Sequence, residues 1–314
     1  KLDPAFKDYI WGGTRLRDEY GKKCDYDKVA ESWELSCHKD GPSVVADGEY
    51  KGLTLNEYIE KAGKGVLGKN CERFENFPIL IKLIDAKDNL SVQVHPDNDY
   101  AMRVEGEYGK TEMWYVVDCD EGATLLYGFK HEITKEEFAR RIADNTLLEV
   151  TNAVPVKKGD VFFIKSGTLH AIGKGILIAE IQQNSNTTYR IYDYGRVGKD
   201  GKPRELHVNK ALDVTKLAPA EQYPETPVEK KDGYDIKLLS KCEYFTTYRV
   251  NVETKAELDA DENSFNSILV LEGEPVISGG ETVSAKKGES VFISAGTGKY
   301  TVEGKCTFVL TKID

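Results

Sequence analysis

A fourteen-residue segment occurs twice in this chain, 129 positions apart. The first copy, residues 157–170, reads KKGDVFFIKSGTLH, and the second copy, residues 286–299, reads KKGESVFISAGTGK. Seven of the fourteen positions are identical, and both copies place an apolar stretch between two glycines. An apolar stretch between glycine turns is typical of a β-hairpin. Because a repeat at long spacing indicates two related structural units, we expect two β-rich modules of similar design.

The two copies differ at their last residue, which is His170 in the first copy and Lys299 in the second. A neutral imidazole is a common metal ligand, whereas a protonated lysine has no acceptor. We therefore expect the first copy to contribute to a metal site and the second copy to have lost that ability.

The remainder of the chain reads mostly as short strands separated by Gly, Asn and Asp turns. Three helices are expected, two of which begin with the spacing of a capping box, and a fourth is expected on the surface within "ELHVNKALDV". The predicted strands are 113–117, 124–127, 161–164 and 175–182, and the predicted helices are 14–20, 54–62 and 134–144.

Residues 216–235 contain three prolines and many charges without apolar periodicity, which predicts a linker. The chain is therefore expected to be mainly β, with helical insertions in a first domain, 1–215, and a small all-β domain, 236–314. Its length of 314 residues allows two domains of this size.

The net charge of −10 argues against nucleic-acid binding, which needs clustered Lys and Arg to neutralise phosphates. The apolar runs are too short to span a bilayer, so no membrane association is expected. Six cysteines are scattered without a C-x-x-C pair, and no secretion signal is recognised at the start. This pattern favours reduced thiols in a cytoplasmic protein.

The stretch Ser91–Asp97, "SVQVHPD", places polar and apolar residues in strict alternation. Successive side chains of a strand point to opposite faces, so Ser91, Gln93 and His95 share one face, and Val92 and Val94 share the other. If the valines pack in the core, the polar face lines either solvent or an interior cavity. The strand pattern leaves this choice open.

These residues resemble the two motifs of the cupin superfamily, whose members are double-stranded β-barrels of the jelly-roll type. One motif carries His or Gln ligands followed by Glu, and the other reads G-x5-P-x-G-x2-H. The resemblance implies two cupin-like barrels, of which only the first binds metal. The implied ligands are Gln93, His95, Glu112 and His170, and such a set suits a divalent ion such as zinc. Lys165 occupies the proline position of the second motif.

Longer stretches resemble short bacterial type I mannose-6-phosphate isomerases, among them "FPILIKLIDAKDNLSVQVHPDND", "GKTEMWYV", "SGTLHAIG" and "QQNSNTTYRIYDYGR". The resemblance implies zinc-dependent interconversion of mannose 6-phosphate and fructose 6-phosphate through an enediol(ate), with one zinc ion per chain. It implies Arg190, Lys110 and Glu180 as catalytic residues. Ser91, Lys110 and Arg190 are the expected substrate contacts, and Lys165 is a further candidate for the phosphate.

Two questions stay open at this point. The general base is either Glu180 or Lys110, because either can move a proton between C1 and C2. Two other functions are also open. One is an Fe(II) cupin oxygenase, because two His and a carboxylate also describe non-haem iron sites. The other is a non-catalytic cupin that binds a sugar phosphate. No functional role is assigned to His38, His131 or His207, and the sequence leaves the oligomeric state open.

Overall fold

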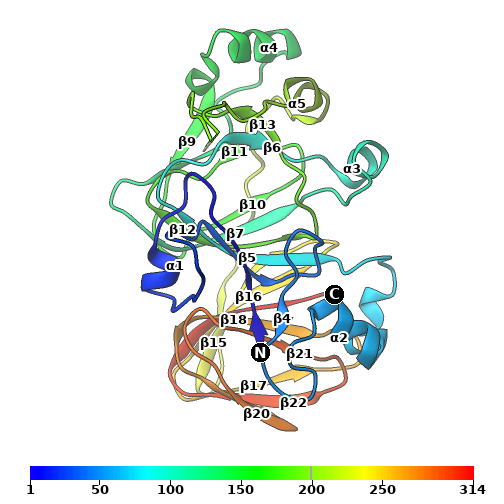
Figure 1. Ribbon diagram of the computed structural model, residues 1–314. Coiled ribbons are helices and arrows are strands. Elements are labelled where there is room, and N and C mark those ends of the chain that lie inside the picture. The colour runs from blue at the N-terminus through cyan, green and yellow to red at the C-terminus, as the bar shows by residue number, and fades with distance from the viewer. Residues whose placement is uncertain (199) are drawn as a thin grey trace.

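The structure, a computed structural model, describes residues 1–198 and 200–314, and it is built mainly of strands. The strands form four antiparallel sheets. Figure 1 shows them in two stacked parts, an upper part that is largely cyan and green and a lower part that is largely yellow to red. We call these parts the first and the second module. The mainly β class predicted from the sequence is confirmed.

The first module contains a six-stranded and a five-stranded sheet. The six-stranded sheet consists, in spatial order, of β10 (Val161–Ile164), β7 (Glu112–Cys119), β12 (Ile176–Gln183), β5 (Ile79–Ala86), β3 (Glu31–Leu35) and β2 (Ala5–Lys7). The five-stranded sheet consists of β13 (Tyr189–Tyr192), β6 (Val92–Val94), β11 (His170–Ala171), β8 (Thr124–Phe129) and β9 (Thr151–Pro155). The predicted strands correspond to β7, β8, β10 and β12, with ends that differ by at most two residues.

The second module contains an eight-stranded and a four-stranded sheet. The larger sheet consists of β14 (Val228–Lys230), β15 (Tyr234–Lys241), β16 (Thr246–Val252), β23 (Cys306–Lys312), β18 (Asn266–Gly273), β21 (Ser290–Ile293), β1 (Leu2–Asp3) and β4 (Val44–Val45). The smaller sheet consists of β17 (Lys255–Ala260), β22 (Gly298–Glu303), β19 (Val276–Gly279) and β20 (Glu281–Ser284).

The N-terminal strand joins the sheet of the second module, because Leu2 of β1 pairs with Ser290 of β21 and with Val45 of β4. The large sheets of the two modules also share one hydrophobic core, to which β5 contributes Leu83 and β18 contributes Leu269. Burial of apolar surface is the main favourable contribution to such packing. The two modules are thus joined by strand pairing and by a common core, in addition to the connecting chain.

The repeated segment has the same structure in both modules. Residues 161–164 form β10, and residues 290–293, 129 positions later, form β21. Gly159 and Gly288, which precede these strands, have φ values of +91° and +87°, a region that favours glycine. In both copies the backbone amide of the first lysine donates to the carboxylate three residues later, at 2.9 Å. Equal turn geometry therefore explains why the same residue types recur.

The helices lie outside the sheets, and two of them, residues 135–143 and 208–214, cover one face of the five-stranded sheet (Figure 1). They are α1 (Arg15–Asp18), α2 (Leu55–Ala62), α3 (Asn98–Val104), α4 (Lys135–Ala143) and α5 (Val208–Val214), with 3₁₀ turns at Lys64–Leu67, Lys69–Cys71 and Leu147–Glu149. The predicted helices and the surface helix correspond to α1, α2, α4 and α5, whereas α3 was not predicted. No helix among the described residues is long and apolar enough to cross a membrane.

The capping box predicted at the start of α2 is confirmed, since Thr54 and Glu57 exchange side-chain to backbone hydrogen bonds. At the start of α4 only half of the predicted box is present. Thr134 accepts from the amide of Glu137, but the Glu137 carboxylate accepts from Arg141 at 3.3 Å instead of bonding back to the cap. A basic residue one turn along the helix thus competes for the glutamate.

Within the predicted linker, 216–235, residues 216–227 form neither helix nor strand apart from one bridge between Pro219 and Gly128, and β14 and the start of β15 follow. The segment lies against the first module, because the Tyr127 hydroxyl donates to the carbonyl of Glu221 at 3.1 Å.

Each of the six cysteines is a free thiol.

Candidate active site

The alternating strand β6 lies between the helices and the interior of the first module. Val92 and Val94 are fully buried beneath Phe138 of α4 and Ala211 of α5. The opposite face, with Ser91, Gln93 and His95, therefore points between the two sheets. Ser91 and His95 are 3% and 1% exposed, so the polar face lines an interior cavity and not the solvent.

Three of the predicted metal ligands, His95, Glu112 and His170, form a buried cluster whose donor atoms lie within 4.8 Å of one another. They come from separate strands, with Glu112 at the start of β7 and His170 at the start of β11. Gln93 is the register partner of His170, and its Nε2 lies 3.4 Å from Nε2 of that histidine. The structure thus brings all four predicted ligands together.

The hydrogen bonds of the two imidazoles show which nitrogens are free. Nδ1 of His95 donates to the carbonyl of Thr187 at 3.0 Å, and Nδ1 of His170 donates to the carbonyl of Thr168 at 2.8 Å. Since a carbonyl only accepts, the ring protons lie on Nδ1 and both Nε2 atoms keep lone pairs. Burial lowers the pKa of His170 to about 4 and that of His95 well below its usual range, so both rings are neutral.

The carboxylate of Glu112 completes the cluster. Its Oε1 lies 3.5 Å from Nε2 of His170 and its Oε2 lies 3.6 Å from Nε2 of His95. Oε1 is buried and has no hydrogen-bond donor among the described residues. Burial, followed by the negative charge of Glu180, raises the pKa of this carboxyl, and the charge of Lys110 offsets only part of the increase. Two lone pairs and a carboxylate that converge in this way fit a divalent cation.

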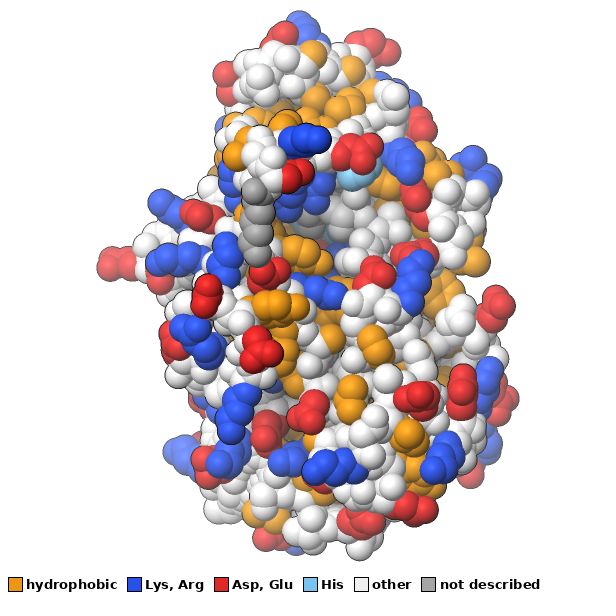
Figure 2. Space-filling view, viewed as in Figure 1, with side chains coloured by type: hydrophobic (Ala, Val, Ile, Leu, Met, Phe, Trp, Pro, Cys, Tyr) orange, Lys and Arg blue, Asp and Glu red, His pale blue; other side chains and the backbone are white. Residues whose placement is uncertain are grey.

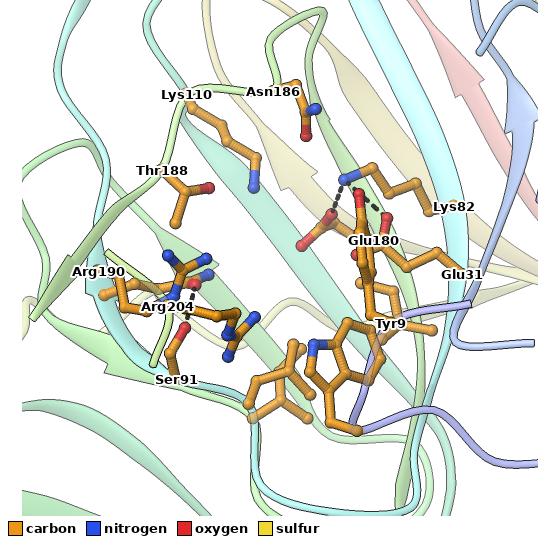
Figure 3. A pocket seen from close by; sticks show the side chains of 15 residues that line it. Tyr9, Glu31, Lys82, Ser91, Lys110, Glu180, Asn186, Thr188, Arg190 and Arg204 are labelled. Carbon is orange, nitrogen blue, oxygen red and sulfur yellow. Dashed lines mark hydrogen bonds and ion pairs between the residues drawn. The ribbon is translucent and has the colours of Figure 1, made fainter. Parts of the chain in front are cut away.

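A pocket of about 240 Å³ lies beside this cluster. Gln93, which lies 3.4 Å from His170, and Lys110, which lies 2.9 Å from Glu112, both line this pocket, so it adjoins the proposed metal ligands. Figure 3 shows Lys110 and the other labelled side chains around the pocket. In Figure 2 the surface is hollowed over the first module, and Lys and Arg side chains gather at the edge of the hollow. The pocket is lined by Tyr9, Trp11, Glu31, Lys82, Ile84, Leu90, Ser91, Gln93, Lys110, Ile172, Glu180, Asn186, Thr188, Arg190 and Arg204.

One side of the pocket holds Glu180 in a fixed orientation. Its Oε2 lies 3.1 Å from Nζ of Lys82, and its Oε1 accepts from the indole N–H of Trp114 at 3.0 Å. Burial alone would raise the pKa of Glu180, but the charges of Lys110 and Lys82 outweigh it and lower the pKa. Glu180 is therefore an ionised carboxylate at neutral pH.

Lys110 connects the pocket with the cluster. Its Nζ lies 2.9 Å from Oε2 of Glu112 and 3.2 Å from Nε2 of His95. The ammonium group is 5% exposed at the side-chain level, so it acts in a nearly dry environment. Charges are much stronger in such surroundings than in water.

Arg190 of β13 reaches the pocket because it pairs in register with Gln93. Its Nη1 donates to the carbonyl of Glu205 at 3.0 Å, while its buried Nε has no acceptor among the described residues. Ser91 also lines the pocket and donates to Oε1 of Gln93 at 3.3 Å. Lys165, the further phosphate candidate, is exposed and pairs with Glu221 at 3.5 Å, away from the pocket lining.

Several lining residues were not singled out from the sequence. Lys82 is 3% exposed and lies between Glu180 and Glu31, whose carboxylate is 3.6 Å away. The signal was available, because a lysine inside the apolar run "ILIKLIDA" of β5 must find a buried partner. Arg204 gave no such signal, since it lies in an irregular segment far from the ligand motifs.

The fold and the site define a protein with a cupin domain and a candidate metal centre beside a cation-rich pocket. The model of the catalytic domain of type I phosphomannose isomerase matches residues 1–122, and that of the cupin domain of mannose-6-phosphate isomerase matches residues 235–313. The chain is 39% identical to the mannose-6-phosphate isomerase ManA of Bacillus subtilis, over 99% of this chain and 97% of ManA. It is 40% identical to the mannose-6-phosphate isomerase of Streptococcus mutans, over 90% of this chain and 88% of that protein.

A crystal structure of the mannose 6-phosphate isomerase from Bacillus subtilis superimposes with a TM-score of 0.93 at 38% identity, and the match covers 99% of this chain and 98% of that one. The chain therefore belongs to the type I mannose-6-phosphate isomerase family of enzymes, which confirms the resemblance seen in the sequence.

Proposed function

We propose that this protein interconverts mannose 6-phosphate and fructose 6-phosphate. The observation that carries the proposal is the ionised, oriented Glu180 in a pocket that adjoins both the His95–Glu112–His170 cluster and several cationic side chains. An aldose–ketose isomerase needs a base at carbon, positive charge near the sugar oxygens and shielding from water. The activity of the relatives supports the same assignment.

We propose zinc as the cofactor, held by Gln93, His95, Glu112 and His170. A neutral imidazole pair with one carboxylate is a donor set that zinc accepts. When bound, such an ion supplies Lewis-acid stabilisation of negative charge that develops on a substrate oxygen. The four ligands come from β6, the segment after it, β7 and β11, so the assembled first module is required to hold the ion.

Glu180 is the proposed base of the isomerisation. It removes the proton at C2 of the open-chain aldose, the electrons of the C–H bond form the C1–C2 double bond, and the π electrons of the C1 carbonyl move to O1 to give an enediol(ate). The O2–H proton then passes to O1 as O2 becomes the carbonyl oxygen, and the proton held by Glu180 returns at C1. Lys82 and Trp114 fix the two carboxylate oxygens, which keeps Glu180 ionised and oriented. Lys110, the alternative base from the sequence, is paired with Glu112 and is better suited to hold a proton near a substrate oxygen.

Arg190 is proposed to stabilise the enediolate. Its buried Nε has no acceptor among the described residues, so it is available for charge that develops during the reaction.

We further propose that each module is a cupin barrel, that the domains are 1–215 and 236–314 with a linker at 216–235, and that the protein is cytoplasmic. The free thiols and the repeated segment, with its equal turn geometry in both modules, support these assignments.

The test is a coupled assay for isomerisation of mannose 6-phosphate with wild type and with Glu180→Gln. The glutamine side chain has nearly the same volume as the glutamate that it replaces. We expect the variant to keep its metal and lose activity by about 100-fold or more, the scale of a removed general base. Glu136→Gln on the exposed face of α4 is the matched control. Consumption of oxygen without isomerisation would instead identify the oxygenase, and sugar-phosphate binding without turnover would identify the binding protein.

A further inference from the structure

The cations of the pocket differ in how far their charge is already balanced. Lys82 is paired with Glu180 and Glu31, and Lys110 is paired with Glu112. Arg190, in contrast, has no carboxylate within ion-pair distance among residues 1–198 and 200–314, and its Nη1 donates to the backbone carbonyl of Glu205. The excess positive charge of the pocket therefore lies on the arginine side.

Arg204 adds a second guanidinium to that side. Figure 3 shows Arg190, Arg204 and Ser91 together at one side of the pocket, opposite Glu31, Lys82 and Glu180. Burial, followed by the charge of Arg204, lowers the pKa of Arg190, and the Asp193 carboxylate, which Arg196 and Arg204 share, offsets this only in part. Such an arrangement is costly unless an anionic ligand occupies it.

The side chain of Arg204 is held rigidly. Its Nε donates to Oδ2 of Asp193 at 2.8 Å and its Nη2 donates to Oδ1 at 2.5 Å, a two-point contact that fixes the plane of the guanidinium. Asp193 directly follows β13, so the scaffold of the first module sets this orientation. Nη1 of Arg204 makes no hydrogen bond in the described part of the chain and is left for a ligand.

We propose that Arg204 recognises the phosphate group of the substrate, with the hydroxyls of Ser91 and Thr188 as further donors. The inference rests on the proposed function, because it assigns an end of the pocket to one end of the sugar phosphate. Arginine is well suited to this role, since its planar donors match phosphate oxygens. A phosphate dianion at the opposite side would meet the carboxylates of Glu31 and Glu180 and be repelled.

The orientation of the substrate follows from this assignment. With the phosphate beside Arg204, the C1 and C2 end of the open chain extends toward Glu180 and the metal cluster. Arg204 is therefore a binding and specificity residue, whereas Arg190, which pairs in register with the proposed ligand Gln93, remains the group that acts on the reacting oxygens. The two arginines should consequently affect different kinetic constants.

The experiment compares Arg204→Ala with Arg196→Ala in the metal-loaded enzyme. Arg196 is the matched control because it also donates to Asp193, from the same segment, but does not line the pocket. We expect Arg204→Ala to raise KM for mannose 6-phosphate about 10-fold or more with kcat within a few-fold, since loss of uniform binding acts on KM. Binding of inorganic phosphate, measured by calorimetry, should weaken in parallel, and Arg196→Ala should change neither value.

Unchanged KM and unchanged phosphate affinity in Arg204→Ala would overturn the proposal. Equal losses in Arg196→Ala and Arg204→Ala would also overturn it, because they would show a general effect on the segment. Arg204→Lys keeps the charge but not the planar fork, and it provides the same comparison if the alanine variant does not fold. Phosphate binding is measured without turnover, so absence of isomerase activity in wild type would refute the proposed function while still testing Arg204.

Discussion

Nε2 of His95 lies 3.1 Å from Nε2 of His170 in the interior of the first module, and both Nδ1 atoms of the pair donate to backbone carbonyls. Each Nε2 therefore presents a lone pair to the other. Two facing lone pairs repel each other unless a positive species lies near both. Lys110 approaches only His95, at 3.2 Å, so the pair and Glu112 form a site that gains stability from a bound cation.

Removal of the metal is expected to lower both activity and thermal stability. A ligand that binds only the folded state stabilises it by about 4 kcal/mol at a free concentration of 1,000 Kd. Treatment with a strong chelator, checked by elemental analysis, should therefore lower Tm by several degrees and abolish isomerisation, and zinc should restore both. Full activity in verified metal-free protein would refute the metal site.

The ligand set is tested by His95→Ala and His170→Ala, each of which should lose bound metal in elemental analysis. His131 is exposed and lies ahead of α4, so His131→Ala is the matched control and should keep its metal. If His95→Ala or His170→Ala still binds one metal ion per chain, the ion is held elsewhere.

Substitution of Arg190 should act on the chemical step. If its guanidinium stabilises charge that develops in the transition state, Arg190→Ala should lower kcat about 100-fold or more while KM and metal content change little. Arg190→Lys should recover only part of the loss, because an ammonium group cannot reproduce the planar fork. Steady-state kinetics with mannose 6-phosphate provide the measurement, and a raised KM with normal kcat would assign Arg190 to binding instead.

The two copies of the repeated segment should differ in function at their last position. Lys299 of β22 is exposed, and its register partner is Asp259, whereas His170 is fully buried and its partner is Gln93. Lys299→Ala should therefore leave activity within a few-fold of wild type, while His170→Ala should cause a severe loss of activity. Comparable losses in two well-folded variants would mean that the second module contributes to the site.

A buried ion pair of the first module, whose lysine also contacts the second module, should control stability. Nζ of Lys22 lies 2.6 Å from Oε1 of Glu34 and also donates to the carbonyl of Gly288 in the repeated turn of the second module. Removing one partner of such a pair leaves a buried charge and costs about 3–5 kcal/mol. We expect Lys22→Met to lower the free energy of unfolding by this amount, as measured by urea denaturation.

The loss in Lys22→Met should depend on pH. Burial already raises the pKa of Glu34, and removal of Lys22 takes away the nearest positive charge. When the folded-state pKa of a carboxyl lies above its unfolded value, stability falls as pH rises, because the unfolded chain then binds fewer protons. Unfolding should be easier at pH 8 than at pH 5, and Lys22→Met/Glu34→Gln should remove most of this difference. A flat pH profile in the single variant would contradict the assignment.

The local patterns of the sequence were sufficient for several features of the structure. The glycine turns around β10 and β21 were predictable because a positive φ favours glycine wherever it occurs. The alternation in β6 was predictable because the period of a strand depends only on its own backbone. The residues of the His95–Glu112–His170 cluster could be named because motif resemblance combines such local signals with their order along the chain.

Contacts between distant segments were decided by the tertiary structure. The pairing of Leu2 with Ser290 unites the start and the end of the chain, and no local pattern in either segment specifies it. The same holds for the charges of the pocket. Lys165 lies next to the ligand motif in sequence but is exposed, whereas Lys82 and Arg204 line the cavity. The physical reason is that strand register and packing set which long side chain reaches a cavity, and these depend on partners far away in the sequence.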